Sequence, residues 1–401
     1  MDRRVSKPRR RGALEGVTVL DLTRLLPGAF CSQMMADMGA EVIKIEDPRG
    51  GDYNRAWEPK AKTESGSFLL LNRNKKSVTL NLKTPEGHAA FLRLVDDADI
   101  LLEGFRPGVM DRLGLGYAAL AARNPGLVYC SLSGYGQDGP LRLAPGHDIN
   151  YMGTAGALQL FGKAGEGPMV PGLSIADVGG GSLMAATGIL GALYSRTVDG
   201  LGQFIDISMT DGTVAWLALH GADHLFADVE PRGGERPYIG QAPCYNIYRC
   251  ADGRYVALGA LELHFWERFC ELVELKPELR THYPEGRAAE DQRAALAGIF
   301  LGRTRDEWAS AGEAADIPLT AVNDMGEAFR HPQMVHRQML LHVDHPVEGR
   351  VPQLGFPIKL GGTPCEIRMP PPTLGEHNEE VLGRAGYSTD EIAAMKAGGA
   401  I

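Results

Sequence analysis

The first part of this 401-residue chain alternates short apolar runs with helical patterns. An apolar run at 17–22 predicts a buried strand, a helical pattern follows at 30–38, and alternating residues at 41–46 predict a second strand. A strand, a helix and a strand in this order predict parallel pairing. Further strands are predicted at 77–82, 100–103, 127–132 and 204–208, and helices at 85–96, 182–196 and 213–226. We therefore expect an α/β fold with a doubly wound, Rossmann-like large domain.

The pattern changes after residues 231–243, which are rich in glycine, proline and charge. Apolar runs at 244–250 and 254–258 flank Ala251-Asp252-Gly253, which is a hairpin signal, and three helical patterns follow at 263–275, 288–301 and 305–314. This pattern predicts a smaller α+β domain. The expected organisation is a basic disordered tail at 1–12, a large domain at 13–230, a linker at 231–243, the small domain at 244–340, and a linker with a C-terminal return to the large domain at 341–401.

Composition narrows the classes of protein that fit. With 44% hydrophobic and 23% charged residues, the chain is typical of a globular protein, and a net charge of −9 disfavours nucleic-acid and acidic-membrane partners. The longest apolar run is too short to predict a membrane span. Six scattered cysteines without a CxxC pair indicate reduced thiols and a cytoplasmic location. Four histidines between 331 and 345 lack the partner spacing of a metal site, so no metal is predicted.

The first strand is not followed by a dinucleotide-binding turn. Residues 23–28 (TRLLPG) lack the GxGxxG spacing, and the chain contains neither a P-loop nor a GxSxG elbow. Several basic residues nevertheless lie where predicted strands meet loops, which is where open α/β sheets bind ligands. They favour a phosphate-bearing ligand; among them are Lys44, Arg49, Lys83, Arg106 and Arg112.

Two titratable residues stand in glycine-rich settings before helical patterns. His147 follows Pro145-Gly146, and Asp177 precedes a run of three glycines at 179–181 that would let a ligand approach closely. A structural histidine and a helix-capping aspartate are the alternatives. Glu262 begins a predicted helix, either as a first-turn acid or as the partner of a histidine.

Five ordered motifs add a family resemblance. They lie at 16–22, 39–46, 74–77, 103–108 and 133–140, and residues 14–386 resemble the class III CoA-transferase superfamily, the CaiB/BaiF family. Within it, GHDINY at 146–151, GQAP at 240–243 and ALE at 260–262 most resemble the α-methylacyl-CoA racemase branch. Leu263 and His264 depart from that branch, as does Asp47 before Pro48, where Arg49 is the substitute for the family's arginine.

The resemblance implies a site, a substrate and an assembly. It implies catalytic roles for His147, Asp177 and Glu262, no cofactor beyond the coenzyme A of an acyl-CoA substrate, and an interlocked homodimer in which Glu262 of one subunit reaches the site of the other. The residues that it implies for the coenzyme A portion are Arg49, Leu80, Asn81, Leu82, Lys83, Gly104, Phe105, Arg106, Arg112, Gly146, Asp148 and Tyr151.

Three function classes follow. The first is an isomerase that moves a proton at the α-carbon of a 2-methyl-branched acyl-CoA, with His147 and Asp177 on opposite faces and backbone N–H groups near 179–181 holding the enolate. The second is a CoA-transferase with a covalent intermediate on Asp177. The third is a non-catalytic CoA-ester binder. The acyl group stays open among a fatty acid, a steroid side chain and a small dicarboxylic acid.

Overall fold

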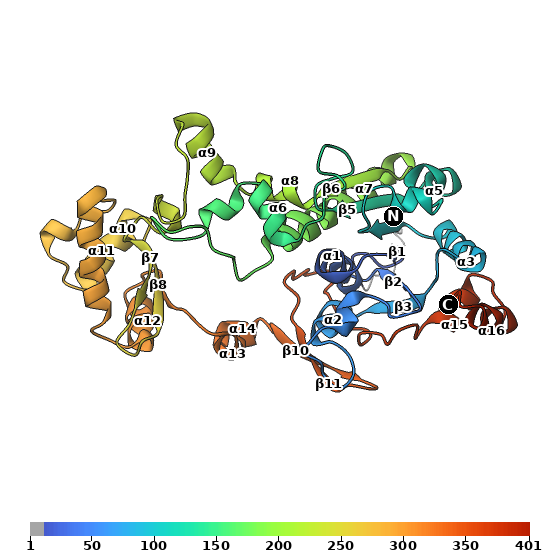
Figure 1. Ribbon diagram of the computed structural model, residues 1–401. Helices are drawn as coiled ribbons and strands as arrows, with labels where there is room; N and C mark the ends of the chain where they lie inside the picture. The colour runs from blue at the N-terminus through green and yellow to red at the C-terminus, as the bar shows by residue number, and fades with distance from the viewer. Residues whose placement is uncertain (1–11) are drawn as a thin grey trace, which may run out of the picture. The chain divides into compact units, whose positions relative to one another are not determined.

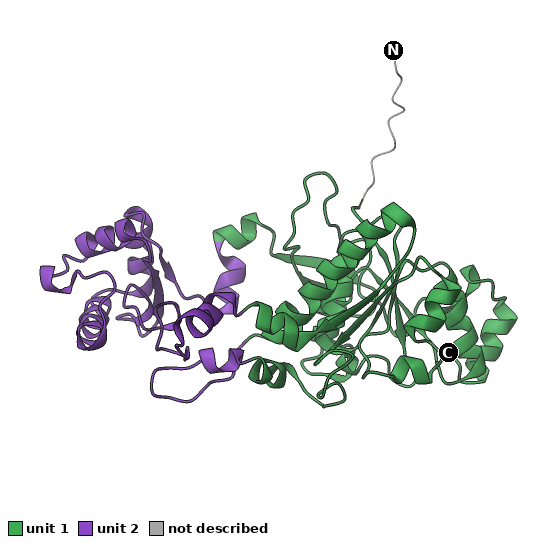
Figure 2. Cartoon of the chain, turned by 90° about the horizontal axis from the view of Figure 1, so that it is seen from above, with its two compact units in different colours: residues 1–155, 173–216, 332–401 green, residues 156–172, 217–331 purple. Residues whose placement is uncertain are grey.

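The computed structural model describes residues 12–401, which separate into two compact units (Figure 2). Unit 1 extends to Ala155 and adds Leu173–Trp216 and Pro332–Ile401, whereas unit 2 comprises Gly156–Gly172 and Leu217–His331. Unit 2 thus includes 156–172 and 217–230, which the sequence analysis assigned to the large domain. The predicted basic tail lies outside the described residues, except for its last residue, Gly12.

Unit 1 is built on a six-stranded sheet in which every strand pair is parallel (Figure 1). Its strands are β1 (Thr18–Asp21), β2 (Glu41–Glu46), β3 (Lys75–Thr79), β4 (Ile100–Glu103), β5 (Val128–Ser133) and β6 (Phe204–Ser208). The order β3-β2-β1-β4-β5-β6 confirms the predicted parallel α/β sheet. The strand order switches between β1 and β4: the chain adds β2 and β3 on one side of β1, and then β4, β5 and β6 on the other. Open sheets of this kind bind ligands at such a switch point, beyond the carboxyl ends of the strands.

Helices cover both faces of the sheet. On one face Leu20 and Ile43 belong to a core that is shared with α3 (Pro85–Asp96), α5 (Tyr117–Arg123), α15 (Asn378–Arg384) and α16 (Thr389–Ala397). Successive strand residues point to opposite faces, so Asp21 points away from this core. There it accepts a hydrogen bond from Ser32 of α1 (Leu25–Asp37), which contacts α7 (Met184–Asp199). The sheet is therefore wound on two sides, as predicted.

Shorter elements complete unit 1. They are η1 (Tyr53–Ala56), α2 (Gly66–Leu71), α4 (Val109–Arg112), α6 (Asp148–Thr154), the π-helix η3 (Ile175–Leu183), α8 (Met209–Ala215), α14 (Pro332–His336) and the hairpin β10 (Leu340–His345) and β11 (Gly349–Leu354). The predicted helix at 213–226 is divided in the structure, because α8 ends at Ala215 and a separate helix, α9 (Ala218–Ala227), begins in unit 2.

Among residues 12–401, one helical stretch, Ile175–Asp199, is long and apolar enough to cross a membrane, which the sequence analysis did not anticipate. Half of its most apolar window is buried inside the protein, and α7 contacts β5, β6 and α1. The stretch therefore packs as a core helix of unit 1. The cytoplasmic location stays a prediction.

Unit 2 combines a small antiparallel sheet with helices. The hairpin of β7 (Tyr245–Arg249) and β8 (Tyr255–Gly259) lies where it was predicted, and β9 (Leu319–Ala321) extends it. The helices are η2 (Ala157–Leu160), α9, η4 (Pro237–Ile239), α10 (Leu263–Leu272), η5 (Pro277–Leu279), α11 (Gly286–Phe300), α12 (Arg305–Ala314) and α13 (Met325–Arg330). Trp266, Phe269 and Phe300 belong to its own buried core, which makes unit 2 a separately packed body.

Candidate active site

A pocket of about 270 Å³ opens in unit 1 where the strand order reverses. It lies beyond the carboxyl ends of β1, β4 and β5 and contains both titratable residues that the sequence analysis singled out. We call it the His147–Asp177 pocket. Its lining residues are Thr23, Arg24, Leu25, Leu26, Pro27, Gly28, Trp57, Gly104, Leu132, Gly146, His147, Tyr151, Ser174, Asp177 and Met209.

The loop at 23–28, between β1 and α1, forms one wall of this pocket. Buried charges hold its backbone: the Lys44 Nζ donates to the Thr23 carbonyl oxygen (2.8 Å), and the Asp52 carboxylate accepts from the Leu25 N–H (3.0 Å). Lys44 and Asp52 also form an ion pair of 2.9 Å with both side chains fully buried. Leu25 has a φ of +64°, a conformation that costs a non-glycine residue of order 1 kcal/mol and needs such support.

His147 stands at the start of α6 and is exposed. The side chain of Asn150 accepts a hydrogen bond from the His147 N–H (3.0 Å), so the backbone is fixed where the helix begins. Tyr151, one turn further on, donates its hydroxyl to the Gly146 carbonyl oxygen (2.6 Å). A Cβ at Gly146 would lie 2.6 Å from the Tyr151 ring, so only glycine allows this packing. The position of the imidazole is therefore set by α6 and its preceding glycine.

Asp177 lies half-buried in the π-helix η3, which leads into α7. π-helical turns are rare and are frequent at functional sites. The Asp177 N–H donates to the Asp148 carboxylate (2.9 Å), which ties η3 to the first turn of α6. Burial and, after it, the neighbouring Asp148 carboxylate raise the pKa of Asp177, whereas His147 acts in the opposite direction, and the net result is a pKa of about 6. The site therefore holds a carboxyl group that can exchange protons near neutral pH.

The glycines at 179–181 pack against a neighbouring helix and do not line the His147–Asp177 pocket. A Cβ at Gly180 would lie 2.4 Å from the Met209 carbonyl oxygen of α8, and one at Gly179 would lie 2.7 Å from the Trp216 ring. This packing gives the glycines a structural reason, and the interpretation that the run lets a ligand approach stays a prediction. The pocket is instead lined by the first turn of α1, whose positive dipole end favours a developing anion.

A second pocket, of about 230 Å³, lies beyond the ends of β1 to β4. We call it the Leu80–Lys83 pocket. The structure brings together there six of the residues expected for coenzyme A: Arg49, Leu80, Asn81, Leu82, Lys83 and Phe105. Arg49 forms two side-chain hydrogen bonds with Asp47 (3.1 and 3.0 Å). Arg24 lines both this pocket and the His147–Asp177 pocket.

The remaining expected residues are dispersed. Gly104, Gly146 and Tyr151 line the His147–Asp177 pocket, and Arg106 lines a further polar pocket of about 340 Å³ that also contains Glu103. Arg112 is exposed and lines none of these three pockets. Glu262 belongs to unit 2, where it precedes α10.

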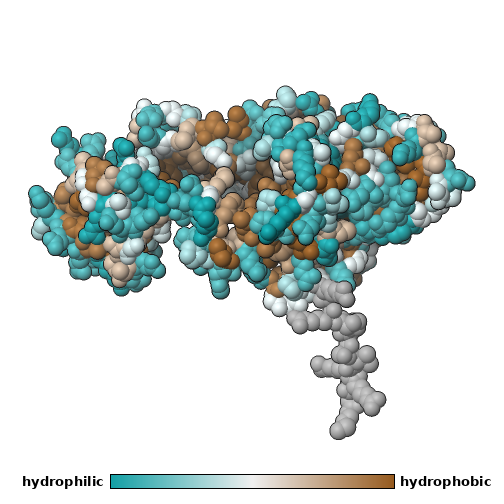
Figure 3. Space-filling model, turned by 90° about the horizontal axis from the view of Figure 1, so that it is seen from below, coloured by the Kyte–Doolittle hydropathy of each residue, from teal (hydrophilic) through white to brown (hydrophobic). Residues whose placement is uncertain are grey.

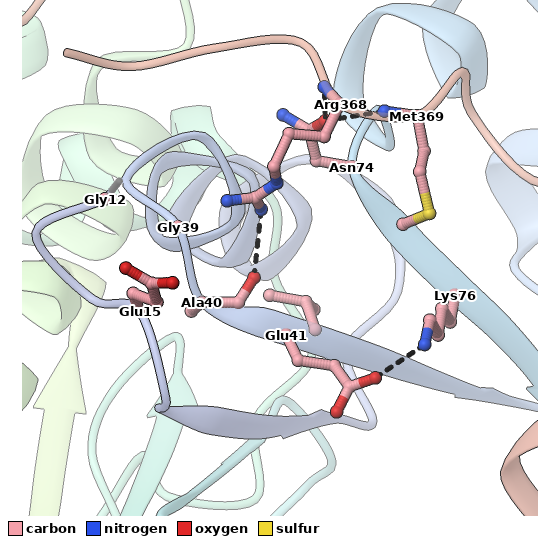
Figure 4. A pocket seen from close by; sticks show the side chains of 10 residues that line it. Gly12, Glu15, Gly39, Ala40, Glu41, Asn74, Lys76, Arg368 and Met369 are labelled. Carbon is pink, nitrogen blue, oxygen red and sulfur yellow. Dashed lines mark hydrogen bonds and ion pairs between the residues drawn. The ribbon is translucent and has the colours of Figure 1, made fainter. Parts of the chain in front are cut away.

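Another pocket, of about 390 Å³, lies at the opposite edge, where β1, β2 and β3 begin (Figure 4). Lys76 pairs with Glu41 (2.6 Å), and Arg368 donates to the Ala40 carbonyl oxygen (3.2 Å) (Figure 4). Asn74 accepts from the backbone N–H groups of Arg368 and Met369, so this pocket joins the C-terminal return to the sheet. Its charges have partners within the protein, which favours a structural role.

Sequence reasoning missed the residues that the β1–α1 loop and distant segments contribute to the His147–Asp177 pocket. Arg24, Leu25 and Leu26 were considered only as a failed dinucleotide turn, and Trp57 and Met209 carried no signal of their own. The available signal was the position of the loop directly after the first strand of a doubly wound sheet. Among residues 12–401, no group of three or more His, Cys, Asp or Glu side chains is arranged to hold a metal ion.

A parallel α/β fold with an imidazole and a carboxyl group in one pocket at the switch point defines an enzyme of the acid/base or nucleophilic class. Residues 14–378 match CoA-transferase family III, and the chain belongs to that family, which confirms the resemblance seen in the sequence.

Two relatives with different activities are similar to the chain to nearly the same degree. An acyl-CoA transferase of Fusarium pseudograminearum is 36% identical over 409 residues, covering 98% of this chain and 89% of the relative. The human alpha-methylacyl-CoA racemase is 35% identical over 383 residues, covering 95% of each. A solved CaiB/BaiF family protein from Brucella suis has a TM-score of 0.82 and 29% identity, covering 94% of this chain and 100% of that chain.

Proposed function

We propose that the protein is an isomerase that inverts the α-carbon of 2-methyl-branched acyl-CoA thioesters. One observation carries this proposal: His147 and Asp177 line the same pocket, and the pKa of Asp177 is raised to about 6. A carboxyl group near that pKa exists in both protonation states at neutral pH, which an acid/base catalyst requires and a nucleophilic carboxylate does not. The similarity to the human racemase supports the same reading.

The reaction needs two proton transfers and no net change in bonding. In one direction His147 takes the α-proton, the electron pair moves onto the thioester oxygen, and Asp177 returns a proton to the opposite face of the carbon. In the other direction the two residues exchange roles. The first turn of α1 lines the pocket, and its dipole would stabilise the enolate oxygen. We assign the coenzyme A portion of the substrate to the Leu80–Lys83 pocket, with its expected binding residues.

A CoA-transferase is the second candidate function, favoured by the half-buried Asp177 facing a ligand pocket and by the similarity to an acyl-CoA transferase. There the Asp177 carboxylate attacks the thioester carbonyl carbon and releases the CoA thiolate, forming an acyl anhydride. The thiolate then attacks the aspartyl carbonyl and releases the carboxylic acid, leaving an aspartyl thioester. An acceptor acid reverses these two steps and takes up the CoA. In this mechanism His147 transfers no proton from carbon.

We propose that the active form is an interlocked homodimer in which Glu262 of one subunit orients the imidazole of the other. The resemblance to the racemase branch implies this arrangement. In support, α7 exposes a stripe of apolar side chains at helical spacing, including Tyr194 (76% exposed) and Val198 (82%). Figure 3 shows apolar side chains exposed in patches among polar ones on one face. Apolar patches of this kind commonly mark protein interfaces.

Exchange of the α-proton with deuterated solvent tests the isomerase. We expect deuterium at the α-carbon of 2-methylbutanoyl-CoA or of 2-methylsuccinyl-CoA with the thioester beside the methyl-bearing carbon, measured by mass spectrometry without any acceptor acid. His147→Ala should lower the rate at which one α-epimer is converted into the other at least ~100-fold, because inversion needs both bases and Asp177 alone can exchange a proton only on its own face, while binding of the thioester persists. His336→Ala, at an exposed histidine on α14, is the matched control and should retain the full rate.

Two outcomes would contradict the isomerase. Interconversion of the two α-epimers at the normal rate by the His147→Ala variant would remove the histidine from the mechanism. Absence of exchange in the unmodified protein, together with borohydride-dependent labelling of Asp177 in the presence of an acyl-CoA donor, would establish the transferase instead.

A further inference from the structure

The backbone of Ala400 contacts the loop that forms the Leu80–Lys83 pocket. The Ala400 carbonyl oxygen accepts a hydrogen bond from the Asn81 N–H (2.8 Å). Asn81 lies between Leu80 and Leu82, and all three residues line the pocket. A segment that is distant in the sequence therefore fixes the backbone of this loop.

The contact with Asn81 continues a series of hydrogen bonds along β3, the edge strand of the six-stranded sheet. The His377 N–H donates to the Ser77 carbonyl oxygen (3.0 Å), and the Thr79 N–H donates to the side-chain oxygen of Asn378 (2.8 Å). The helix α15 contacts the same strand (Figure 1). The C-terminal return thus covers the sheet edge, which would otherwise expose unpaired backbone groups, and reaches the end of β3 where the pocket opens.

A Schellman motif at the end of α16 sets the path of the chain up to Ala400. Gly399 has a φ of +72°, and its N–H donates to the Lys396 carbonyl oxygen (3.2 Å), while the Ala400 N–H donates to the Met395 carbonyl oxygen (2.9 Å). This pair of hydrogen bonds satisfies carbonyl groups of the last helical turn and fixes the direction in which the chain leaves the helix. The position of Ala400 is therefore determined by α16.

Ile401 anchors this segment in the core of unit 1. Its side chain is buried in the same apolar cluster as Leu80, and Leu82 and Phe105 pack against that cluster. Ile401 therefore shares one core with three residues that line the Leu80–Lys83 pocket. Removing the isoleucine side chain would loosen the segment that holds Asn81, because an apolar side chain is held in a core by the surface that it buries.

We propose that Ala400 and Ile401 are positioning residues for coenzyme A, which hold the Asn81 backbone so that the loop is ordered before the ligand binds. A loop that is ordered in only a fraction of the molecules binds its ligand with an affinity reduced by that fraction. The inference rests on the proposed function only for the assignment of coenzyme A to the Leu80–Lys83 pocket. It does not depend on whether the reacting pair exchanges a proton or transfers CoA.

Two isoleucines of one core provide a matched pair for the test. Ile401 is 9% exposed and Ile392 of α16 is 8% exposed, and both belong to the same apolar cluster, but the Ile392 N–H donates to Ser388 at the start of its own helix (3.0 Å). Calorimetric titration with coenzyme A gives the dissociation constants. We expect Ile401→Ala to raise Kd at least ~5-fold, Ile401→Val to raise it about 2-fold, and Ile392→Ala to leave it unchanged, because only position 401 holds the loop.

Hydrogen exchange at the Asn81 N–H measures the contact itself. Exchange should be faster in Ile401→Ala than in Ile392→Ala, and coenzyme A should slow it in the unmodified protein, because ligand binding and docking of the segment stabilise each other. In steady-state assays, Ile401→Ala should raise KM for the thioester by a larger factor than it lowers kcat, since the loop contacts the CoA portion and not the reacting carbon.

An unchanged Kd in Ile401→Ala would overturn the proposal, and so would an equal rise in Ile392→Ala. If Ile401→Ala fails to fold, Ile401→Val against Ile392→Val gives the same comparison, and equal Kd values would again overturn the proposal. Lys83→Gln tests the pocket: if it leaves Kd unchanged, coenzyme A binds elsewhere and both the assignment and this inference are wrong. Affinity that depends on Ile401 without α-proton exchange would contradict the isomerase and leave this inference standing.

Discussion

At the scale of single residues, Asp148 connects the structure of the site to its chemistry. Its carboxylate accepts the hydrogen bond of the Asp177 N–H and, after burial, is the main cause that raises the pKa of Asp177. One side chain thus positions the π-helix and adjusts the proton affinity of the group on it. An asparagine at position 148 would separate the two roles, because its amide oxygen can accept the same hydrogen bond but carries no negative charge.

We therefore expect Asp148→Asn to shift the pH dependence of α-proton exchange. In the direction where Asp177 is the base, kcat/KM rises as pH rises through about 6, because the carboxylate must be ionised. Removing the neighbouring negative charge lowers the pKa of Asp177, so the pH range over which kcat/KM rises should move to lower pH. Rates measured from pH 4.5 to 8 provide the test. Asp291→Asn, an exposed variant in α11 of unit 2 with the same change in net charge, should leave the rising part of the pH profile in place. An unmoved profile in Asp148→Asn would contradict the assignment.

Glu103 is a second carboxyl group with a raised pKa, in the polar pocket beside Arg106. Burial raises its pKa to about 7, although Ser131 and the Phe105 N–H (2.7 Å) donate hydrogen bonds to it. Because the folded protein binds this proton more tightly than the unfolded chain does, stability is lost as pH rises from the ordinary value of 4.5 to about 7.

Glu103→Gln should remove that pH dependence. The amide stays neutral, so at pH 8 the variant should unfold with a free energy higher by roughly 3 kcal/mol, because the pKa is raised from 4.5 to about 7 and each pKa unit is worth about 1.4 kcal/mol. At pH 4.5 the two proteins should differ little. Urea unfolding at both pH values measures this difference. A gain of the same size at both pH values would show that packing, and not ionisation, is responsible.

At the scale of elements, the contact between η3 and α8 determines where Asp177 lies. Gly180 of η3 faces the backbone of α8, and a Cβ there would lie 2.4 Å from the Met209 carbonyl oxygen and 2.9 Å from the Thr213 nitrogen. Both atoms belong to the backbone of α8, so they cannot move aside unless the helix moves. The glycine is therefore required for the close approach of the two elements.

We expect Gly180→Ala to destabilise unit 1 by roughly 1–3 kcal/mol, the usual cost of overpacking a buried contact, and to lower the exchange rate by displacing Asp177. Gly298→Ala is the matched control, because it lies in α11 with open space around its Cβ. That variant should be more stable by about 0.5–1 kcal/mol from its helix propensity alone. Thermal unfolding compares both variants, and equal stabilities would contradict the packing account.

Elements with strong local signals could be predicted from the sequence. The helix α3 begins at Pro85 as expected, because the side chain of Thr84 caps it by accepting from the Gly87 N–H, and proline is favoured in the first turn. The helix α12 matches its predicted bounds for a similar reason, with Thr304 and Glu307 in a capping box.

Features set by tertiary contacts could not be predicted. The π-helix η3 and the break after Ala215 depend on how η3 packs against α8, which no local pattern records. The same holds for the site. His147 and Asp177 were selected from their glycine-rich settings, but their common pocket with Arg24 exists only because the sheet brings three strand ends together. The role of Glu262 stays a prediction.

At the scale of the whole molecule, an interlocked homodimer makes a prediction about mixed subunits. Chains with His147→Ala and chains with Glu262→Ala should each form inactive homodimers. When the two are co-expressed with different tags and purified through both, the mixed dimer should regain the ability to convert one α-epimer into the other. In one of its two sites an intact imidazole meets an intact Glu262 from the partner subunit. Absence of recovery would indicate that both residues serve the same chain, or that Glu262 has no part in the site.

The buried residues that anchor the loop at 23–28 determine which positions can be mutated to change acyl-group selection. The backbone of this loop is anchored to Lys44 and Asp52, which are inaccessible to solvent, whereas the side chains of Arg24, Leu25 and Leu26 reach the pocket from positions that are only partly buried. Randomising these three positions would therefore vary acyl-group selection on an unchanged frame, whereas a library that included Lys44 or Asp52 would mostly yield chains that fold poorly. The loop is a natural place for relatives of one fold to diverge in substrate while retaining the same reacting pair.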